Sequence, residues 1–397
     1  MTRHSAALSA LVVLPLTLGG LTTASGAVDN GTSTIVSVDP EQRSARQSAK
    51  LQMHPQIAAS GPALQPAGAA KSAMTATFKP RKVKRPVTLQ RKSGSRWVNK
   101  SKGRQNRKGV AEFTGAYAKG RATYRVVAPR YRGLKPVKSA GVVTSKPGAA
   151  DFTDDFAAGL DPATWATRGD DYQPTSKRTC SRPSADATRV SGGVAKLRVL
   201  VDPDPPGALP RRCSYDGELY KWRLNGHIGT QNTYSFKYGY AAARIKFQAR
   251  QGQHGSFWMN PATQVTTLGS ASSTGAEIDV IEWFGERARR GGLYSFLHHW
   301  PDDEATPVKV GGAIPNPARY GKDWAGRYHV FSVEWTPSRY VFRIDGQETF
   351  RTSKAVSGQE QYLILSLLSS DYELENLGNE NKLPQTMSVD WVRTWER

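Results

Sequence analysis

The sequence predicts an all-β protein in which a small Ig-like β-domain precedes a larger jelly-roll sandwich. Short segments of alternating apolar and polar residues recur between turn residues, and few stretches show helical periodicity. The 397 residues suffice for two or three domains, and 10 Trp, 15 Tyr and 12 Phe can fill a core. A formal net charge of +22 is concentrated in one block, which indicates a domain boundary.

The N-terminus has the pattern of a secretory signal. Residues 1–27 contain a short polar start with Arg3, a mostly apolar run over 6–21 and small residues at its end. Pro15 interrupts this run, which is short for a membrane anchor. Residues 28–72, rich in Ala, Ser, Gln and Pro, predict a disordered linker. We therefore expect a secreted monomer, extracellular or cell-wall associated, with no membrane span.

A basic β-domain is expected over residues 73–147. Ser93-Gly94-Ser95 predicts a hairpin, and Pro147-Gly148 ends the block. The expected strands are 75–78, 87–92, 96–100, 110–114, 122–128 and 141–144. About 75 residues of such strands favour an Ig-like sandwich.

The basic block defines the expected partners. Residues 71–148 hold 22 Lys and Arg against one acid, Glu112, while residues 149–397 hold 29 residues of each sign. Clusters such as 79–85 predict binding to an anionic cell-wall polymer, either teichoic-acid-like or an acidic polysaccharide; the alternative is a soluble spacer. No nucleic-acid-binding signature accompanies the charges, so nucleic acid is not expected.

The jelly-roll domain is expected over residues 150–397. Its alternating segments are 194–199, 239–247, 278–283, 293–300, 329–335, 340–344, 362–368 and 387–395. Two cysteines, Cys180 and Cys213, predict one disulfide in an exported protein, because no further Cys or His lies near either for a metal site.

The segment 277–283 is a strand by composition but carries three acids. Regular alternation places Glu277 and Asp279 on one face and sends Glu282 to the core. A β-bulge around Val280-Ile281 restores Glu282 to the face of the other acids, and it is favoured because a lone buried charge is costly. Such carboxylates suit glycoside hydrolysis, in which one acts as a nucleophile and another as acid and base. The alternative is a calcium-binding or solvated acidic strand.

Glu277-Ile278-Asp279-Val280-Ile281-Glu282 resembles the signature of family 16 glycoside hydrolases, in the bulged form of laminarinase-type members. Further matching segments are 152–156, 238–246, 255–261, 328–346 and 388–393. The resemblance implies a concanavalin-like jelly roll and a retaining mechanism without a catalytic cofactor. It also implies that Glu277 is the nucleophile, Asp279 a helper and Glu282 the acid/base.

The same resemblance and strand parity suggest substrate-binding residues. They are Trp258, Asn260, Arg244, His298, Trp300 and Trp283. Asp390 resembles a residue that binds a structural calcium in the family. Departures beside the cleft, namely Ala242, His254-Gly255 and Ser366, leave the polysaccharide open. We expect a β-1,3- or β-1,3-1,4-glucan hydrolase; a transglycosylase and a non-catalytic carbohydrate-binding or adhesion protein are the alternatives.

Overall fold

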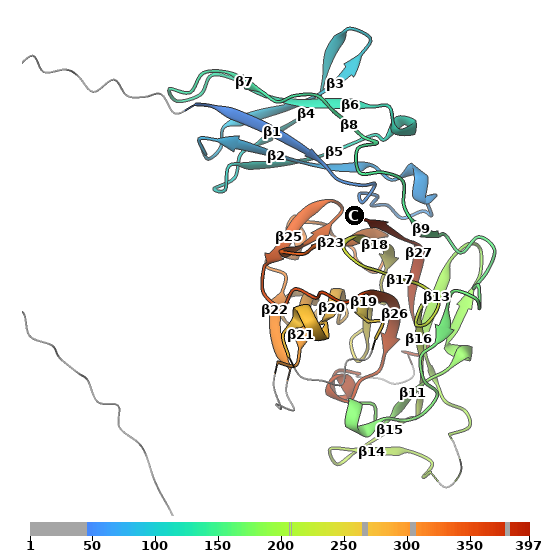
Figure 1. Ribbon diagram of the computed structural model, residues 1–397. Helices are drawn as coiled ribbons and strands as arrows, with labels where there is room; N and C mark the ends of the chain where they lie inside the picture. Colours follow the sequence, from blue (N-terminus) through green and yellow to red (C-terminus); the bar gives the residue numbers. More distant parts are fainter. Residues whose placement is uncertain (1–45, 206, 208, 264–268, 302–306, 378–381) are drawn as a thin grey trace, which may run out of the picture. The chain divides into compact units, whose positions relative to one another are not determined.

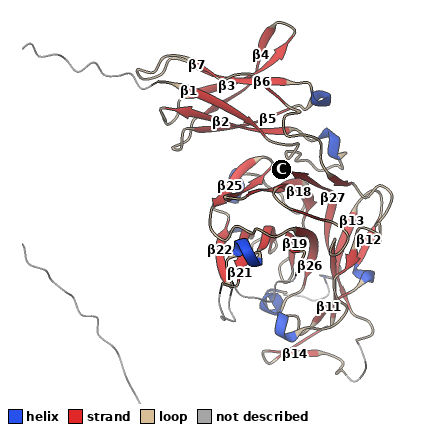
Figure 2. Cartoon of the chain, in the orientation of Figure 1, coloured by secondary structure: helices blue, strands red, loops and turns tan. Residues whose placement is uncertain are grey.

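The structure is a computed structural model of the chain. It describes residues 46–205, 207, 209–263, 269–301, 307–377 and 382–397. The predicted signal peptide at 1–27 lies outside the described residues. Strands dominate the described part of the chain, and its helices are single short turns (Figure 2). None of these helices is long and apolar enough to cross a bilayer.

The N-terminal domain is a sandwich of two antiparallel sheets (Figure 1). Its strands are β1 (Ser48–Met53), β2 (Ser72–Lys79), β3 (Pro86–Ser93), β4 (Arg96–Arg104), β5 (Val110–Gly115), β6 (Thr123–Ala128), β7 (Val137–Lys138) and β8 (Val142–Val143). One sheet has the order β1-β2-β5, and the other has the order β4-β3-β6-β7 with β8 also on β6. Alternate residues of both sheets, such as Met74 and Val126, are fully buried between them, as period-2 patterning requires.

The predicted linker over 28–72 is wrong for its second part. Residues 46–72 are described, and β1 pairs with β2 from Ser48 opposite Lys79 to Met53 opposite Met74. Leu51 and Met53 enter the core of the sandwich. The Ala, Ser and Gln around them lower the apparent hydrophobicity of the segment, and this composition hides a strand that is held by its partner.

The C-terminal domain is the predicted jelly roll, with seventeen strands among the described residues. They are β9 (Phe152–Asp154), β10 (Ala166–Thr167), β11 (Ser181–Pro183), β12 (Thr188–Val190), β13 (Ala195–Val201), β16 (Arg223–Gly229), β17 (Ser235–Phe236), β18 (Gly239–Lys246), β19 (His254–Pro261), β20 (Glu277–Trp283), β21 (Leu293–His299), β22 (Val308–Ala313), β23 (His329–Thr336), β24 (Arg339–Ile344), β25 (Gln347–Thr352), β26 (Gln361–Leu368) and β27 (Gln385–Glu396). A separate hairpin joins β14 (Cys213–Tyr215) to β15 (Glu218–Tyr220). The short helical turns are η1 (Ala67–Ala69), η2 (Ala118–Gly120), η3 (Pro174–Ser176), η4 (Ala185–Ala187), α1 (Ala271–Thr274), η5 (Arg289–Gly291), η6 (Pro317–Arg319) and η7 (Asp371–Asn376).

Two layers of strands enclose the core of this domain. One layer runs β25-β24-β23-β18-β27-β13, and the other runs β22-β21-β20-β19-β26-β16. Apolar side chains from both layers, among them Phe257, Ile281, Val333 and Leu365, form one buried cluster. The layer with β20 therefore has its other face available for a site, and β20 lies between β19 and β21 (Figure 1).

The outer face of the layer with β18 is covered by the chain that follows β1. Ile57, Ala70 and Ala73 share a buried apolar cluster with Tyr240 and Trp391. In addition, His54 Nδ1 lies 2.9 Å from the Tyr240 hydroxyl in a buried hydrogen bond. The segment that the composition suggested as a linker is thus a packed layer.

Candidate active site

The catalytic strand contains the expected β-bulge. On β19, Trp258 faces Asp279 and the next residue, Phe257, faces Ile281, so Val280 is the extra residue. The pairing with β21 shifts in the same interval. Val280 and Ile281 both enter the core. The prediction is confirmed in its geometry, because the bulge returns Glu282 to the face of the other acids.

All three predicted carboxylates line one cleft of about 680 Å³. Its other walls come from β19, β21, β22, β26, η7 and the loops after β20 and before β11. The cleft is lined by Trp258, Phe284, Tyr294, Phe296 and Tyr372 as aromatic groups and by Arg178, Arg289 and Lys309 as cations, besides His254, His298, Ser256, Ser366 and the acids Glu373 and Glu375. An acidic centre between aromatic walls suits a sugar chain, whose rings present apolar faces.

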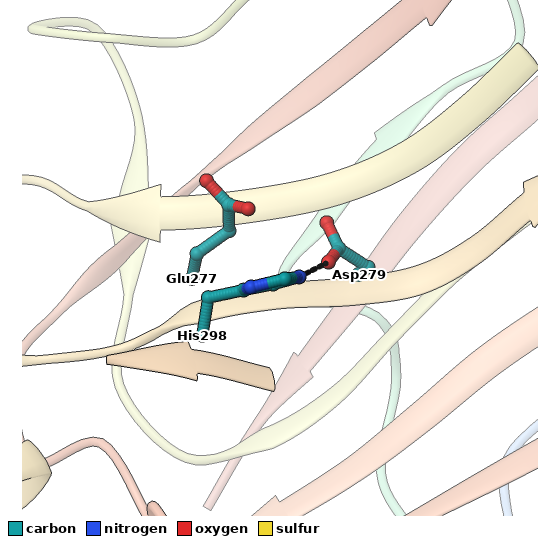
Figure 3. A group of neighbouring side chains, drawn as sticks. All are labelled: Glu277, Asp279 and His298. Atoms are coloured by element: carbon teal, nitrogen blue, oxygen red, sulfur yellow. Dashed lines mark ion pairs between the residues drawn. The ribbon is translucent and has the colours of Figure 1, made fainter. Parts of the chain in front are cut away.

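His298 and Asp279 form the closest pair in the centre. His298 Nε2 lies 3.2 Å from Asp279 Oδ2, and Glu277 stands beside them (Figure 3). One ligand-type atom from each of the three residues lies within 4.8 Å of the other two. A divalent metal could use such a cluster, but the His298–Asp279 contact satisfies both groups internally. Asp279 is therefore held in place next to Glu277.

Burial raises the pKa values of all three acids. Burial and then the charge of Asp279 raise the pKa of Glu277 to about 8, although His298 opposes the shift. Burial raises the pKa of Asp279 to about 7, against Lys309. Burial, with the charges of Asp279 and Glu277, raises the pKa of Glu282 well above its usual range. Glu282 is therefore the carboxyl that keeps its proton longest, as a general acid must.

His254 is a neutral neighbour of Glu282. Its Nε2 lies 4.0 Å from Glu282 Oε1 and 3.3 Å from the Tyr372 hydroxyl, and its ring stacks on Phe284 at 5.2 Å. Burial, with the charge of Arg178, lowers the pKa of His254 to about 3. The imidazole therefore adds no positive charge that would favour ionisation of Glu282.

Trp258 is a half-buried ring in the cleft wall. Its Nε1–H donates to Ser366 Oγ over 3.0 Å. The imidazole of His227 stacks on it at 5.9 Å, and the guanidinium of Arg168 lies 5.3 Å from its ring centre. These contacts fix the ring at the position that the sequence suggested for substrate binding.

Two predicted substrate residues lie elsewhere. Asn260 pairs with Tyr362 further along β19, and it is not among the residues that line the cleft. Trp300 is 42% exposed beyond the end of β21, also outside the cleft lining, although Tyr294, Phe296 and His298 of the same strand line it as predicted. Strand parity gives a shared face, but it does not determine how far along the strand the cleft extends.

Trp283 is a core residue. It is buried in the main cluster, and its Nε1–H donates to the Gln248 carbonyl over 2.7 Å. The prediction of a substrate contact at this position is wrong, because the bulge turns Glu282 to the cleft and the next residue to the interior.

Arg244 is the clearest correction. Instead of lying in the cleft it is buried on the opposite layer, where it forms an ion pair with Asp390. Its guanidinium also donates to the carbonyls of Ala59 and Ala63, the latter over 3.0 Å. The Gln65 amide completes the group by donating to Asp390 over 3.0 Å.

This arrangement does not fit the calcium site expected at Asp390. The carboxylate already accepts from a guanidinium and a backbone amide. A dication beside the buried charge of Arg244 would be repelled. The prediction of a metal ligand at Asp390 is therefore replaced by a cross-link between the jelly roll and residues 59–65.

We expect Asp390→Asn to lower the free energy of unfolding by about 3–5 kcal/mol, because it leaves the buried Arg244 without its counter-charge. Urea denaturation measures the change, with the exposed Asp204→Asn as the matched control. Added calcium or EDTA should leave the Tm of the unmodified protein unchanged. A rise in Tm with calcium would contradict the assignment.

The predicted disulfide joins Cys180 and Cys213. It lies next to a cleft wall, since Arg178 lines the cleft and the hydroxyl and amide of Thr179 donate to Asp371 at 2.7 and 2.9 Å. Asp371 begins η7, which contributes Tyr372 to the cleft. The bridge thus restrains the segment that holds this wall.

Cys180→Ser/Cys213→Ser is expected to lower the free energy of unfolding by about 3–4 kcal/mol, as the loss of a cross-link over a separation of 33 residues predicts. Because η7 loses its anchor, KM should rise more than kcat falls. Initial rates and denaturation curves test both points. A double variant with unchanged KM would show that the wall stands without the bridge.

The sequence did not identify several cleft residues. Arg178, Lys309 and Tyr372 come from segments distant from β20, and no local motif marks them. A signal existed only for His254 and Ser366, which are departures from the family pattern at positions beside the cleft.

A carboxylate trio on a bulged strand of a jelly roll, set in an aromatic-walled cleft, defines the class of glycoside hydrolases. Residues 214–393 match the family model described as glycosyl hydrolases family 16. The C-terminal domain thus belongs to this family. A curated relative, glucan endo-1,3-beta-glucosidase A1 of Niallia circulans, is 26% identical over 251 residues, covering 59% of this chain. The match covers 34% of that relative, so the chain spans about a third of its length.

Solved structures resemble the same part of the chain. The laminarinase catalytic domain of Thermotoga maritima is similar with a TM-score of 0.49 and 18% identity, over 63% of this chain and 98% of that one. The endo-beta-1,3-glucanase of Pyrococcus furiosus gives a TM-score of 0.47 and 18% identity, over 62% and 94%.

Proposed function

We propose that the protein is a retaining endo-glycoside hydrolase that cleaves a β-1,3- or β-1,3-1,4-glucan by double displacement. The observation that carries the proposal is the bulge in β20, which brings Glu277, Asp279 and Glu282 into one cleft. The name of the curated relative supports the β-1,3 linkage.

In the proposed mechanism, a Glu277 oxygen attacks the anomeric carbon while Glu282 gives its proton to the departing glycosidic oxygen. The C–O bond to the leaving sugar breaks, and an ester joins the remaining sugar to Glu277. Glu282, now ionised, takes a proton from water, and that water displaces Glu277 at the same carbon. Asp279, fixed by His298, supports the ionic form of the site that each step needs.

The pKa order predicts the pH dependence. Activity requires an ionised Glu277 and a protonated Glu282 in the free enzyme. Because the pKa of Glu277 is raised to about 8 and that of Glu282 is raised further, kcat/KM should rise with pH through a limb above the usual range of glutamate. A pH–rate profile measures this limb. An acid limb near pH 4.5, the ordinary value for Glu, would contradict the proposed electrostatics.

Product analysis tests the reaction. Reducing-end release from laminarin, lichenan, agarose and xyloglucan identifies the polymer, and a fast fall in viscosity identifies endo action. Proton NMR at early times should show the β-anomer first, as retention requires. First formation of the α-anomer would overturn the mechanism.

Two alternatives give different results in the same assay. A transglycosylase would redistribute chain lengths with few new reducing ends. A carbohydrate-binding or adhesion protein would bind the polymer without releasing any product.

We further propose that the protein is exported. The signal-like segment 1–27 supports this, and so does the disulfide between Cys180 and Cys213, because such bonds persist in oxidising compartments. Sequencing the N-terminus of protein recovered from the culture medium tests it. Intact Met1 on cytoplasmic protein would overturn the proposal.

A further inference from the structure

The β4-β3-β6-β7 sheet of the N-terminal domain has one face in the sandwich core and one face outside it. Val87 and Leu89 of β3 are buried in the core. The alternate residues of β3 and their cross-strand partners point the other way. We call this outer surface the basic face; it comprises Gln90, Lys92, Trp97, Lys102, Arg125 and Lys138.

A fixed aromatic and polar group lies within the basic face. The guanidinium carbon of Arg125 lies 4.2 Å from the centre of the Trp97 ring. Arg125 Nε donates to Gln90 Oε1 over 2.8 Å, and Gln90 Nε2 donates to Asn99 Oδ1 over 2.9 Å. A Cβ at Gly141 would lie 3.3 Å from Trp97 Cη2, so this glycine leaves room for the edge of the ring. Trp97 nevertheless stays half-buried rather than enclosed.

The cations of the basic face have no counter-charge. Lys92, Lys102 and Lys138 are exposed, and none of them forms an ion pair with another described residue. Glu112, the single acid of residues 71–148, lies on β5 in the other sheet and accepts from the Glu348 amide over 2.8 Å. The positive potential of this face is therefore left to an external anion.

The spacing favours a polymer over a small anion. Lys102 lies opposite Thr88 on β3, and Thr88 lies opposite Val127 on β6, which in turn faces Lys138 on β7. This row crosses four strands and spans about 14 Å at the usual strand separation. A small anion cannot contact both ends, whereas an extended chain can.

We propose that the basic face binds a polyuronate, that is, an acidic polysaccharide with carboxylates on its pyranose rings. The lysines neutralise carboxylates, Arg125 offers a planar donor for one of them, and the Trp97 ring supplies a platform for a sugar ring. A phosphate-linked polyol would satisfy the cations but would leave Trp97 without a ring to contact. The site is separate from the cleft and does not depend on the proposed hydrolysis.

Titration of the full chain with polygalacturonate tests the charges. Lys102→Glu/Lys138→Glu should weaken binding about tenfold or more at low salt, since two attractive charges become repulsive. The matched control is Lys50→Glu/Arg107→Glu, which changes the net charge equally at exposed sites outside the basic face. Binding of the unmodified protein should also fall steeply with salt. Absent binding at low salt, or an equal loss in the control, would overturn the proposal.

Trp97→Ala tests the platform and distinguishes a sugar polymer from other polyanions. We expect it to weaken polygalacturonate binding about fivefold or more while leaving inorganic polyphosphate unaffected, because the stacking contribution requires a ring. An unchanged Tm shows that the domain remains folded, and Trp97→Phe, which keeps an aromatic face, should restore most of the affinity. Equal affinity of Trp97→Ala and the unmodified protein for polygalacturonate would overturn the assignment.

Discussion

Glu277→Gln is expected to lower kcat for glucan hydrolysis by about 10⁴-fold or more, as the loss of a catalytic nucleophile does in other enzymes. The amide keeps the size of the side chain but does not form the ester to the anomeric carbon. Initial rates with laminarin measure the loss. The matched control is Glu286→Gln, an exposed acid shortly after β20 that does not line the cleft.

A second measurement separates a lost nucleophile from a damaged site. Glu277→Ala with an aryl β-glucoside and sodium azide should form an α-glycosyl azide, because azide enters where the carboxylate stood and reacts once. Proton NMR identifies this anomer. Normal turnover by a folded Glu277→Gln protein would remove Glu277 from the mechanism, and a β-glycosyl azide would place the nucleophile elsewhere.

The bulge could be predicted because two simple costs conflict. Strict alternation would bury Glu282 beside Ile281, and a lone carboxylate in a core costs several kcal/mol or more. One extra residue removes that cost, and the structure places it at Val280. The local sequence was sufficient here because both the signal and its resolution lie within one strand.

Long-range pairing was not predictable in the same way. Arg244 has the parity of a cleft residue in a sequence pattern, but its partner Asp390 lies 146 positions away and its other acceptors lie in residues 59–63. The docking of those residues depends on β1, whose weakly apolar composition resembles a linker. The error at Arg244 and the error in the linker therefore have a single cause.

The cleft walls show the same limit. η7 brings Tyr372 beside His254, and a contact network through Asp371 and the disulfide holds that wall. None of these residues has a motif, because each acts through a neighbour distant in sequence. Sequence patterns thus located the chemistry on β20, whereas the shape around it required the tertiary structure.

Glu282→Gln is expected to lower kcat/KM for laminarin by about 10³-fold or more, since the glycosidic oxygen then leaves without a proton. An aryl β-glucoside with a strongly acidic phenol as its leaving group needs no such proton. Its glycosylation step should therefore fall far less, and single-turnover release of the phenol measures it. A folded variant that loses both substrates equally would show that Glu282 is not the acid.

The pH profile gives an independent result for the same variant. Burial, together with the charges of Asp279 and Glu277, raises the pKa of Glu282, so its proton is lost only at high pH and the rate of the unmodified enzyme falls there. Glu282→Gln has no proton to lose, and its alkaline limb should disappear while the acid limb from Glu277 remains. The control Glu286→Gln should retain both limbs. Persistence of the alkaline limb in Glu282→Gln would assign the acid to another cleft group, and the raised pKa of Glu373, at about 7, makes that residue the next candidate.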